Sequence, residues 1–86
     1  YEGYYASVIY AYLASLGVNI IAEDVTNRGK IDLTVILNDI VYILEFKVLN
    51  STPKTNTALN QIVKNKYHEK YIDKYDDIYL IGIVFN

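Results

Sequence analysis

Two carboxylates and one lysine interrupt apolar segments in the middle of the chain. Asp32 lies in the segment IDLTVIL, and Glu45 and Lys47 lie in the segment IVYILEFKV. Both segments are rich in β-branched residues, which favour strands. Because side chains alternate along a strand, Glu45 and Lys47 should share one face. Carboxylates beside a lysine could bind a divalent cation and act on a phosphorus centre.

A two-residue turn at residues 38–39 would place Asp32 directly opposite Glu45 on the neighbouring strand. The Cβ atoms of such a pair lie about 4.5–5.5 Å apart, and like charges at this distance destabilise a sheet. A divalent cation would compensate them, and two carboxylates with several retained waters suit Mg²⁺. Lys47 would then orient a water nucleophile or stabilise negative charge that develops on phosphorus.

A purely structural interpretation explains the same residues. Asp32 and Glu45 could pair with Lys30 or Lys47 in a ladder of charges on a solvated face of the sheet. Their apolar neighbours favour a buried cluster instead, and buried charged clusters are more often functional. These neighbours are Ile31, Leu33, Ile43, Leu44 and Phe46. Spacing alone leaves both interpretations open.

The rest of the chain predicts the elements that position these residues. They are a helix over residues 2–16, strands over 18–26, 30–37 and 40–49, a loop over 50–56, a helix over 57–71 and a strand over 78–85. Short turns favour an antiparallel meander of the first three strands, and the helical crossover favours a parallel fourth strand. We therefore expect an α/β (α+β) domain with a mixed four-stranded sheet and a helix on each face. The last strand is almost entirely apolar, which is typical of a strand buried on both faces.

Composition restricts the class of protein. A chain of 86 residues is one domain, spanning residues 1–86, and the absence of Met suggests that it is excised from a longer protein. It has no Cys and a single His, His68, which excludes disulfides, thiol catalysis and metal sites built from these residues. The apolar runs are too short to cross a membrane, so we expect a cytoplasmic domain without a membrane partner.

The charges are unevenly distributed. A net charge of −2 argues against a protein that coats nucleic acid, yet five of the eight basic residues lie between positions 54 and 74. These residues would create a local positive face. Lys66 and Lys70 interrupt the apolar stripe of the second predicted helix. They could reach towards a phosphate, or extend over apolar surface to solvent, which is the more common behaviour.

The sequence GKIDL followed by ILEFK resembles the motif of the PD-(D/E)XK nuclease superfamily. In that superfamily an Asp and a following Glu-x-Lys form a metal-dependent active site within an αβββαβ, restriction-endonuclease-like core. Further residues resemble the nuclease-like domain at the C-terminal end of AAA-type ATPase-like proteins from bacteria and archaea. They are Glu2, Ala58 to Ile62, Lys66, Tyr67 and Ile81 to Phe85.

This resemblance implies roles for particular residues. Asp32 and Glu45 would be ligands of Mg²⁺ or Mn²⁺, the Phe46 carbonyl would be a further ligand, and Lys47 would be the catalytic lysine.

Two auxiliary residues also follow from the resemblance. Glu2 matches an acid that some relatives add to the site, although an acid in the first turn also stabilises a helix. Gln61 matches a glutamine that borders the site, although the helical periodicity places it away from the apolar stripe.

The function that the resemblance predicts is divalent-metal-dependent hydrolysis of DNA phosphodiester bonds. The alternative is a catalytically silent nuclease fold that docks or positions DNA for an attached AAA-type ATPase. The intact set of Asp32, Glu45 and Lys47 favours activity. An unpaired strand edge and ten tyrosines in a small domain favour a homodimer.

Overall fold

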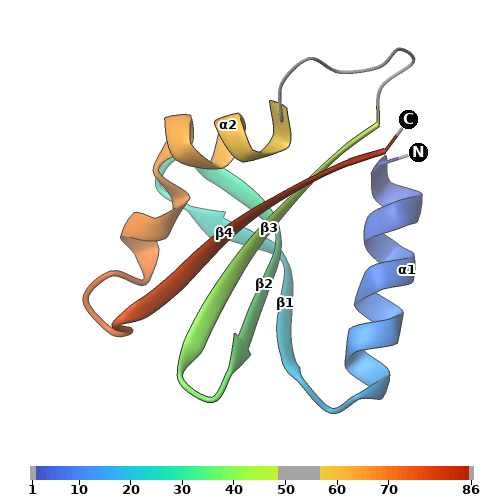
Figure 1. Cartoon of the computed structure of the whole chain (residues 1–86), viewed down its shortest axis with the longest axis horizontal. Coiled ribbons are helices and arrows are strands. Elements are labelled where there is room, and N and C mark those ends of the chain that lie inside the picture. Colours follow the sequence, from blue (N-terminus) through green and yellow to red (C-terminus); the bar gives the residue numbers. More distant parts are fainter. Residues whose placement is uncertain (1, 49–56, 86) are drawn as a thin grey trace.

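The computed structural model describes residues 2–48 and 57–85, apart from the side chains of Glu2 and Thr57 (Figure 1). The elements are α1 (Glu2–Ser15), β1 (Asn19–Thr26), β2 (Gly29–Leu37), β3 (Ile40–Val48), α2 (Thr57–Asn65), the short 3₁₀ helix η1 (Tyr67–Lys70) and β4 (Asp77–Phe85). Their order confirms the predicted αβββαβ arrangement. The predicted strand ending at Leu49 and the loop over 50–56 extend beyond the described residues.

The strands form one sheet in the order β1-β2-β3-β4. β2 is antiparallel to both β1 and β3, whereas β4 is parallel to β3. Asn38 and Asp39 both have positive φ, at 52° and 64°, as a two-residue type I′ hairpin turn requires. α1 and α2 lie on opposite sides of the sheet (Figure 1). The predicted mixed sheet with a helix on each face is therefore confirmed.

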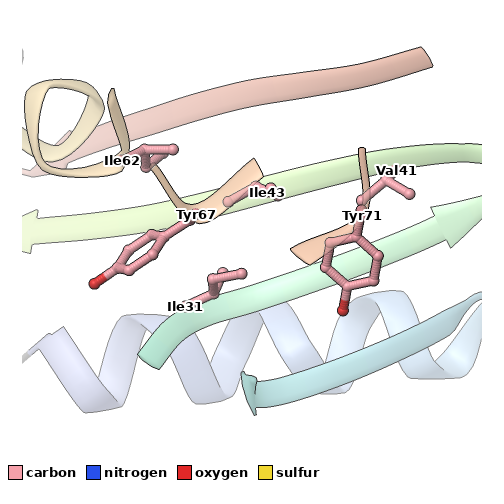
Figure 2. Packing of buried hydrophobic residues seen from close by; sticks show 6 residues of the cluster. All are labelled: Ile31, Val41, Ile43, Ile62, Tyr67 and Tyr71. Carbon is pink, nitrogen blue, oxygen red and sulfur yellow. The ribbon is translucent and has the colours of Figure 1, made fainter. Parts of the chain in front are cut away.

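Each face of the sheet has its own hydrophobic core. The core beneath α2 and η1 consists of Ile31, Val41, Ile43, Ile62, Tyr67 and Tyr71 (Figure 2). The core beneath α1 consists of Leu33, Val35, Leu44 and Phe46, against which Ala6, Ile9 and Leu13 of the helix pack. Alternation of side chains along β3 produces this division, because Ile43 and Leu44 point to opposite faces. A strand with apolar residues on both faces therefore holds Glu45 in the middle of the domain.

α1 has an apolar face that the sheet does not cover. The helix ends where Gly17 takes a φ of 76°, which is typical of a glycine just beyond a helix C-terminus. The three- and four-residue spacing of apolar residues predicts a buried stripe of Tyr5, Ile9, Tyr12, Leu13 and Leu16. Tyr12 and Leu16, however, are 65% and 59% exposed. The stripe that packs on the sheet is instead Ala6, Ile9 and Leu13. The predicted membership of the core is wrong at Tyr12 and Leu16 because α1 is apolar on several sides, which makes its periodicity ambiguous.

The second predicted helix is interrupted, so a single helix over 57–71 is wrong. α2 ends at Asn65, and Lys66 takes a φ of 53° in the left-handed region before η1 begins. The break turns Tyr67 into the core, where its hydroxyl accepts a hydrogen bond from Asn65 Nδ2 at 3.1 Å. The same hydroxyl would lie 3.1 Å from a Cβ at Gly29. Burial of Tyr67 against this glycine therefore explains why the helix does not continue.

Beyond the break, η1 is tied to β1 through a buried carboxylate. Asp24 is 3% exposed and accepts hydrogen bonds from Thr34 Oγ1, the Tyr71 hydroxyl and Lys70 Nζ. Lys70 also donates to the Val25 carbonyl at 2.8 Å. Burial by itself would raise the pKa of Asp24, but these hydrogen bonds and the charge of Lys70 outweigh it and hold the pKa below its usual value. The network joins residues 46 and 47 positions apart in the sequence.

β4 packs against the cores on both faces of the sheet, as predicted, but its burial is only partial because it lies at an edge. Its residues are mostly half-buried, and Tyr79 is 53% exposed. The homodimer, which the unpaired edge favours, stays a prediction. No helix within residues 2–48 and 57–85 has the length and apolar character needed to span a bilayer.

Candidate active site

β1 and β2 exchange their faces at one point along their length. Residues two apart in a regular strand share a face. Ile31, however, packs in the core beneath α2, whereas Leu33 packs in the core beneath α1. On β1, Glu23 has a φ of 50° in the left-handed region and lies across from this same step. Asp32 thus occupies a kink, of the kind that often redirects a side chain near a functional site.

At the kink, side chains replace the backbone ladder between β2 and β3. In the described strands, backbone pairing runs from the hairpin turn to Leu33 and Leu44, in the predicted register. One step further, the Asp32 N–H donates to Glu45 Oε1 at 3.3 Å, and the Phe46 N–H donates to Asp32 Oδ2 at 2.8 Å. Asp32 and Glu45 are therefore brought together as predicted from the turn, but through carboxylate-to-backbone bonds.

Glu45 is a buried carboxyl group without a paired cation. It is 2% exposed, and the ion pairs among the described residues do not include it. Burial is the largest cause that raises the pKa of Glu45, the hydrogen bond and charge of the Asp32 carboxylate act in the same direction, and the resulting pKa is about 8. The Asp32 N–H and the charge of Lys47 act in the opposite direction but do not prevail. The pair is therefore short of positive charge.

This shortage should make the metal-free protein lose stability as pH rises. Glutamate in the unfolded chain ionises near its ordinary pKa of 4.5, whereas Glu45 keeps its proton up to about pH 8. Between these values the folded state binds more protons, so the contribution of Glu45 is complete below about pH 4.5 and lost by about pH 8. In EDTA, we expect Glu45→Gln to exceed the wild type by at least about 1 kcal/mol near pH 9 and to match it near pH 5. Urea unfolding at both pH values measures the difference.

An identical pH dependence in the two proteins would contradict the raised pKa. Asp39→Asn, which alters an exposed acid in the hairpin turn, serves as the matched control and should leave the pH dependence of unfolding unchanged.

Phe46 and Lys47 complete the set that the sequence predicts. The N–H and C=O of one strand residue point towards the same neighbouring strand. Because the Phe46 N–H donates to Asp32, the Phe46 carbonyl also faces β2, although its ring packs in the core beneath α1. Lys47 is half-buried two residues beyond Glu45, close enough for its charge to lower the pKa of that group. The Phe46 carbonyl thus faces the strand that bears Asp32, and the charge of Lys47 acts on Glu45.

The two auxiliary residues have different outcomes. Gln61 Nε2 donates to Glu45 Oε2 at 3.4 Å, so the helix-borne amide lies at the site even though it is off the apolar stripe of α2. Glu2 is the first residue of α1, but its side chain lies outside the described residues.

A cleft of about 510 Å³ gives access to Asp32. It lies between the first half of α1, from Gly3 to Tyr10, and the kinked part of β1 and β2. Glu23 also lines it, on the β1 side. No local pattern in the sequence marks Glu23, because a glutamate within an apolar strand gives no signal for a left-handed φ.

The donor set that results is small and consists of oxygen. Among residues 2–48 and 57–85, no group of three or more His, Cys, Asp or Glu side chains gathers at one point. Asp32, Glu45 and the Phe46 carbonyl therefore offer two carboxylates and one backbone oxygen. Hard cations such as Mg²⁺ prefer oxygen ligands and retain several waters, so these residues fit such an ion.

Asp32 lies on the kinked strand β2, and Glu45 and Lys47 follow on β3, the next strand of the mixed sheet. The family model of the PD-(D/E)XK nuclease superfamily matches residues 1–86, and the chain belongs to that superfamily. Membership indicates a nuclease-type function.

A curated relative shows that such a chain also occurs within a longer protein. The chain is 45% identical over 86 residues to the "Uncharacterized protein in vnfD 5'region" of Azotobacter chroococcum mcd 1. The match covers 100% of this chain and 16% of the relative. The described domain thus corresponds to a small part of that protein.

Proposed function

We propose that this domain is a divalent-metal-dependent nuclease that hydrolyses DNA phosphodiester bonds. The observation that carries the proposal is the uncompensated Asp32–Glu45 pair at the kink. Each carboxylate accepts a hydrogen bond from a backbone N–H of the other strand, yet burial and the neighbouring Asp32 carboxylate raise the pKa of Glu45 to about 8. A natural protein retains such an unfavourable arrangement more readily at a functional site. The cleft beside Asp32 leaves room for a substrate.

Asp32, Glu45 and the Phe46 carbonyl would hold a Mg²⁺ or Mn²⁺ ion. Such an ion, when bound, supplies positive charge that polarises a phosphoryl oxygen and acidifies bound water. Gln61 orients Glu45 through its amide donor and fixes one carboxylate oxygen. The Asp32 carboxylate is held in turn by the Phe46 N–H. These two hydrogen bonds preorganise the oxygen ligands, so that little rearrangement precedes the reaction.

Lys47 would act on the substrate directly. Its ammonium group carries positive charge on the same face as Glu45, where it can donate a hydrogen bond to a water nucleophile or to an oxygen on phosphorus. Charge that develops on phosphorus in the transition state is then stabilised by a donor that the strand already positions.

We expect the wild-type chain to bind Mn²⁺ and, with Mn²⁺ or Mg²⁺, to hydrolyse DNA. Asp32→Ala and Glu45→Ala should lose both properties, because each removes one of the two carboxylate ligands. Calorimetric titration with Mn²⁺ and hydrolysis of a labelled oligonucleotide measure the two effects. Asp73→Ala, which removes an exposed acid away from the kink, should behave like the wild type. Equal Mn²⁺ affinity in all four proteins would refute the site.

Two further predictions concern the protein to which this domain belongs. An attached AAA-type ATPase, which the resemblance implies, stays a prediction, and so does a silent DNA-positioning role. The buried Asp32–Glu45 pair favours the catalytic proposal over the silent one, since a domain that binds no metal gains nothing from retaining two adjacent carboxyl groups.

A further inference from the structure

The outward face of α2 carries polar side chains together with the exposed Val63, and the helix contains no acidic residue. Ala58 and Ile62 bury the opposite face of the helix. Asn60, Gln61, Lys64 and Asn65 line an open groove of about 390 Å³ on the outward face. Residues four apart are neighbours on a helix surface, so Asn60 lies beside Lys64 and Gln61 beside Asn65. The groove begins at the residue that contacts Glu45, because Gln61 both lines it and donates to that carboxylate.

A second pocket lies beyond the break at Lys66. It has a volume of about 540 Å³ and is lined by the turn between β1 and β2 together with Lys66, Glu69 and Lys70. Arg28 of the turn also lines it. The two openings are adjacent along the chain, since Asn65 lines the first and Lys66 the second.

The charges in this region are not all neutralised within the domain. Glu69 pairs with Arg28 at 3.6 Å, and the buried Asp24 pairs with Lys70. The ion pairs among the described residues leave out Lys64 and Lys66, which are both exposed. A position in the last turn of α2 favours a cation such as Lys64 through the helix dipole, but this does not account for Lys66, which follows the helix.

We propose that the outward face of α2, together with the pocket beside Lys66, binds the sugar-phosphate backbone of the nucleic acid whose phosphodiester lies at Asp32 and Glu45. Lys64 and Lys66 contact phosphates, and Asn60 and Asn65 donate hydrogen bonds to backbone oxygens. Lysines and amides that contact phosphate and sugar position a strand without reading its sequence. The inference rests on the proposed nuclease function and deepens it by assigning sequence-independent contacts to one side of the active site.

Binding of a fluorescently labelled oligonucleotide in EDTA tests this surface separately from catalysis. The double variant Lys64→Gln/Lys66→Asn removes both charges, and Asn suits the left-handed φ at position 66. We expect its affinity to fall several-fold and the slope of log K against log salt to decrease by about 0.9 per lost phosphate contact on duplex DNA. Lys64→Arg/Lys66→Arg should restore both values. Lys74→Gln, in the turn before β4, is the matched control and should bind like the wild type.

Two outcomes would contradict the proposal that this surface binds nucleic acid. They are an unchanged affinity and salt slope in the double variant, or an equal loss in Lys74→Gln. The nuclease proposal has its own readout, which is hydrolysis of bis(4-nitrophenyl) phosphate by the wild type with Mn²⁺. This small diester has a single phosphate, so it offers no neighbouring phosphates for Lys64 or Lys66 to contact. Hydrolysis of the diester without a lysine-dependent DNA affinity would refute the surface alone, whereas lysine-dependent binding without hydrolysis would refute the nuclease proposal alone.

Discussion

Lys47→Met should lower metal-dependent DNA hydrolysis by roughly 10²–10³-fold, which is the usual cost of removing one preorganised donor from a transition state. Methionine keeps much of the length and apolar character of the lysine stem, so packing beside β4 should change little. Mn²⁺ should still bind, since Asp32, Glu45 and the Phe46 carbonyl remain. Single-turnover hydrolysis of a labelled oligonucleotide gives the rate, and calorimetry gives the Mn²⁺ affinity.

Two comparisons separate a catalytic lysine from a structural one. Lys30→Met removes an exposed lysine whose ammonium group lies 3.9 Å from Glu23 Oε1, and it should leave the rate close to that of the wild type. Lys47→Arg keeps the positive charge and should recover part of the activity if charge is what the residue supplies. A rate in Lys47→Met within a few-fold of the wild type would contradict the role. A loss of Mn²⁺ binding together with the rate would assign Lys47 to the metal site instead.

The hairpin between β2 and β3 could be predicted from the sequence because its information is local. Two residues at 38–39 that tolerate positive φ set a two-residue turn, and the turn sets the register as far as Leu33 and Leu44. The position of Asp32 opposite Glu45 then follows from counting residues back from the turn. Alternation along β3 likewise predicts that Glu45 and Lys47 share a face while Phe46 points to the other.

The kink in β1 and β2 could not be predicted in this way. Regular alternation assigns Ile31, Leu33 and Val35 to one face, but Ile31 packs beneath α2 and the other two beneath α1. The change of face is set by tertiary packing, because Ile31 fills the core beneath α2 while Leu33 and Val35 fill the core beneath α1. Glutamate has no preference for a left-handed φ, so the sequence does not indicate the backbone conformation of Glu23. Neither the kink nor the position of Glu23 in the cleft could therefore be predicted.

The break at Lys66 shows the same limit in the second helix. Helical periodicity continues through Tyr67 and Tyr71, and it therefore predicts one helix. Both residues are indeed buried. Tyr67 is buried against Gly29 and Tyr71 against Asp24, however, and these partners lie 38 and 47 residues earlier in the chain. Propensity carries no information about such contacts, which override it. The contact of Gln61 with Glu45 is unpredictable for the same reason, because a helical wheel gives the side of the helix and not what faces it.

Asp24→Ala should be the most destabilising single substitution outside the two apolar cores. It removes the acceptor of three buried or half-buried donors, which are Thr34 Oγ1, the Tyr71 hydroxyl and Lys70 Nζ. Breaking a buried pair by deleting one partner costs about 3–5 kcal/mol, and the lower value applies because the Lys70 side chain is 37% exposed and can reach water. For a domain of this size about 3 kcal/mol corresponds to a fall in Tm of roughly 12–24 °C. Thermal and urea unfolding at neutral pH measure it.

The pH dependence of stability provides a second test of the hydrogen bonds to Asp24. Hydrogen bonds and the charge of Lys70 hold the pKa of Asp24 below its ordinary value of 3.8, so Asp24 adds stability above that value and loses it as pH falls through the lowered pKa. The stability difference between the wild type and Asp24→Ala should therefore shrink on acidification, in the opposite sense to Glu45. Asp24→Asn keeps one acceptor oxygen and should lie between the two, whereas Asp73→Ala, which removes an exposed acid of the following turn, should unfold like the wild type. If Asp24→Ala were as stable as Asp73→Ala at neutral pH, the carboxylate would not hold η1 to β1, and the break at Lys66 would have to be maintained by Tyr67 alone.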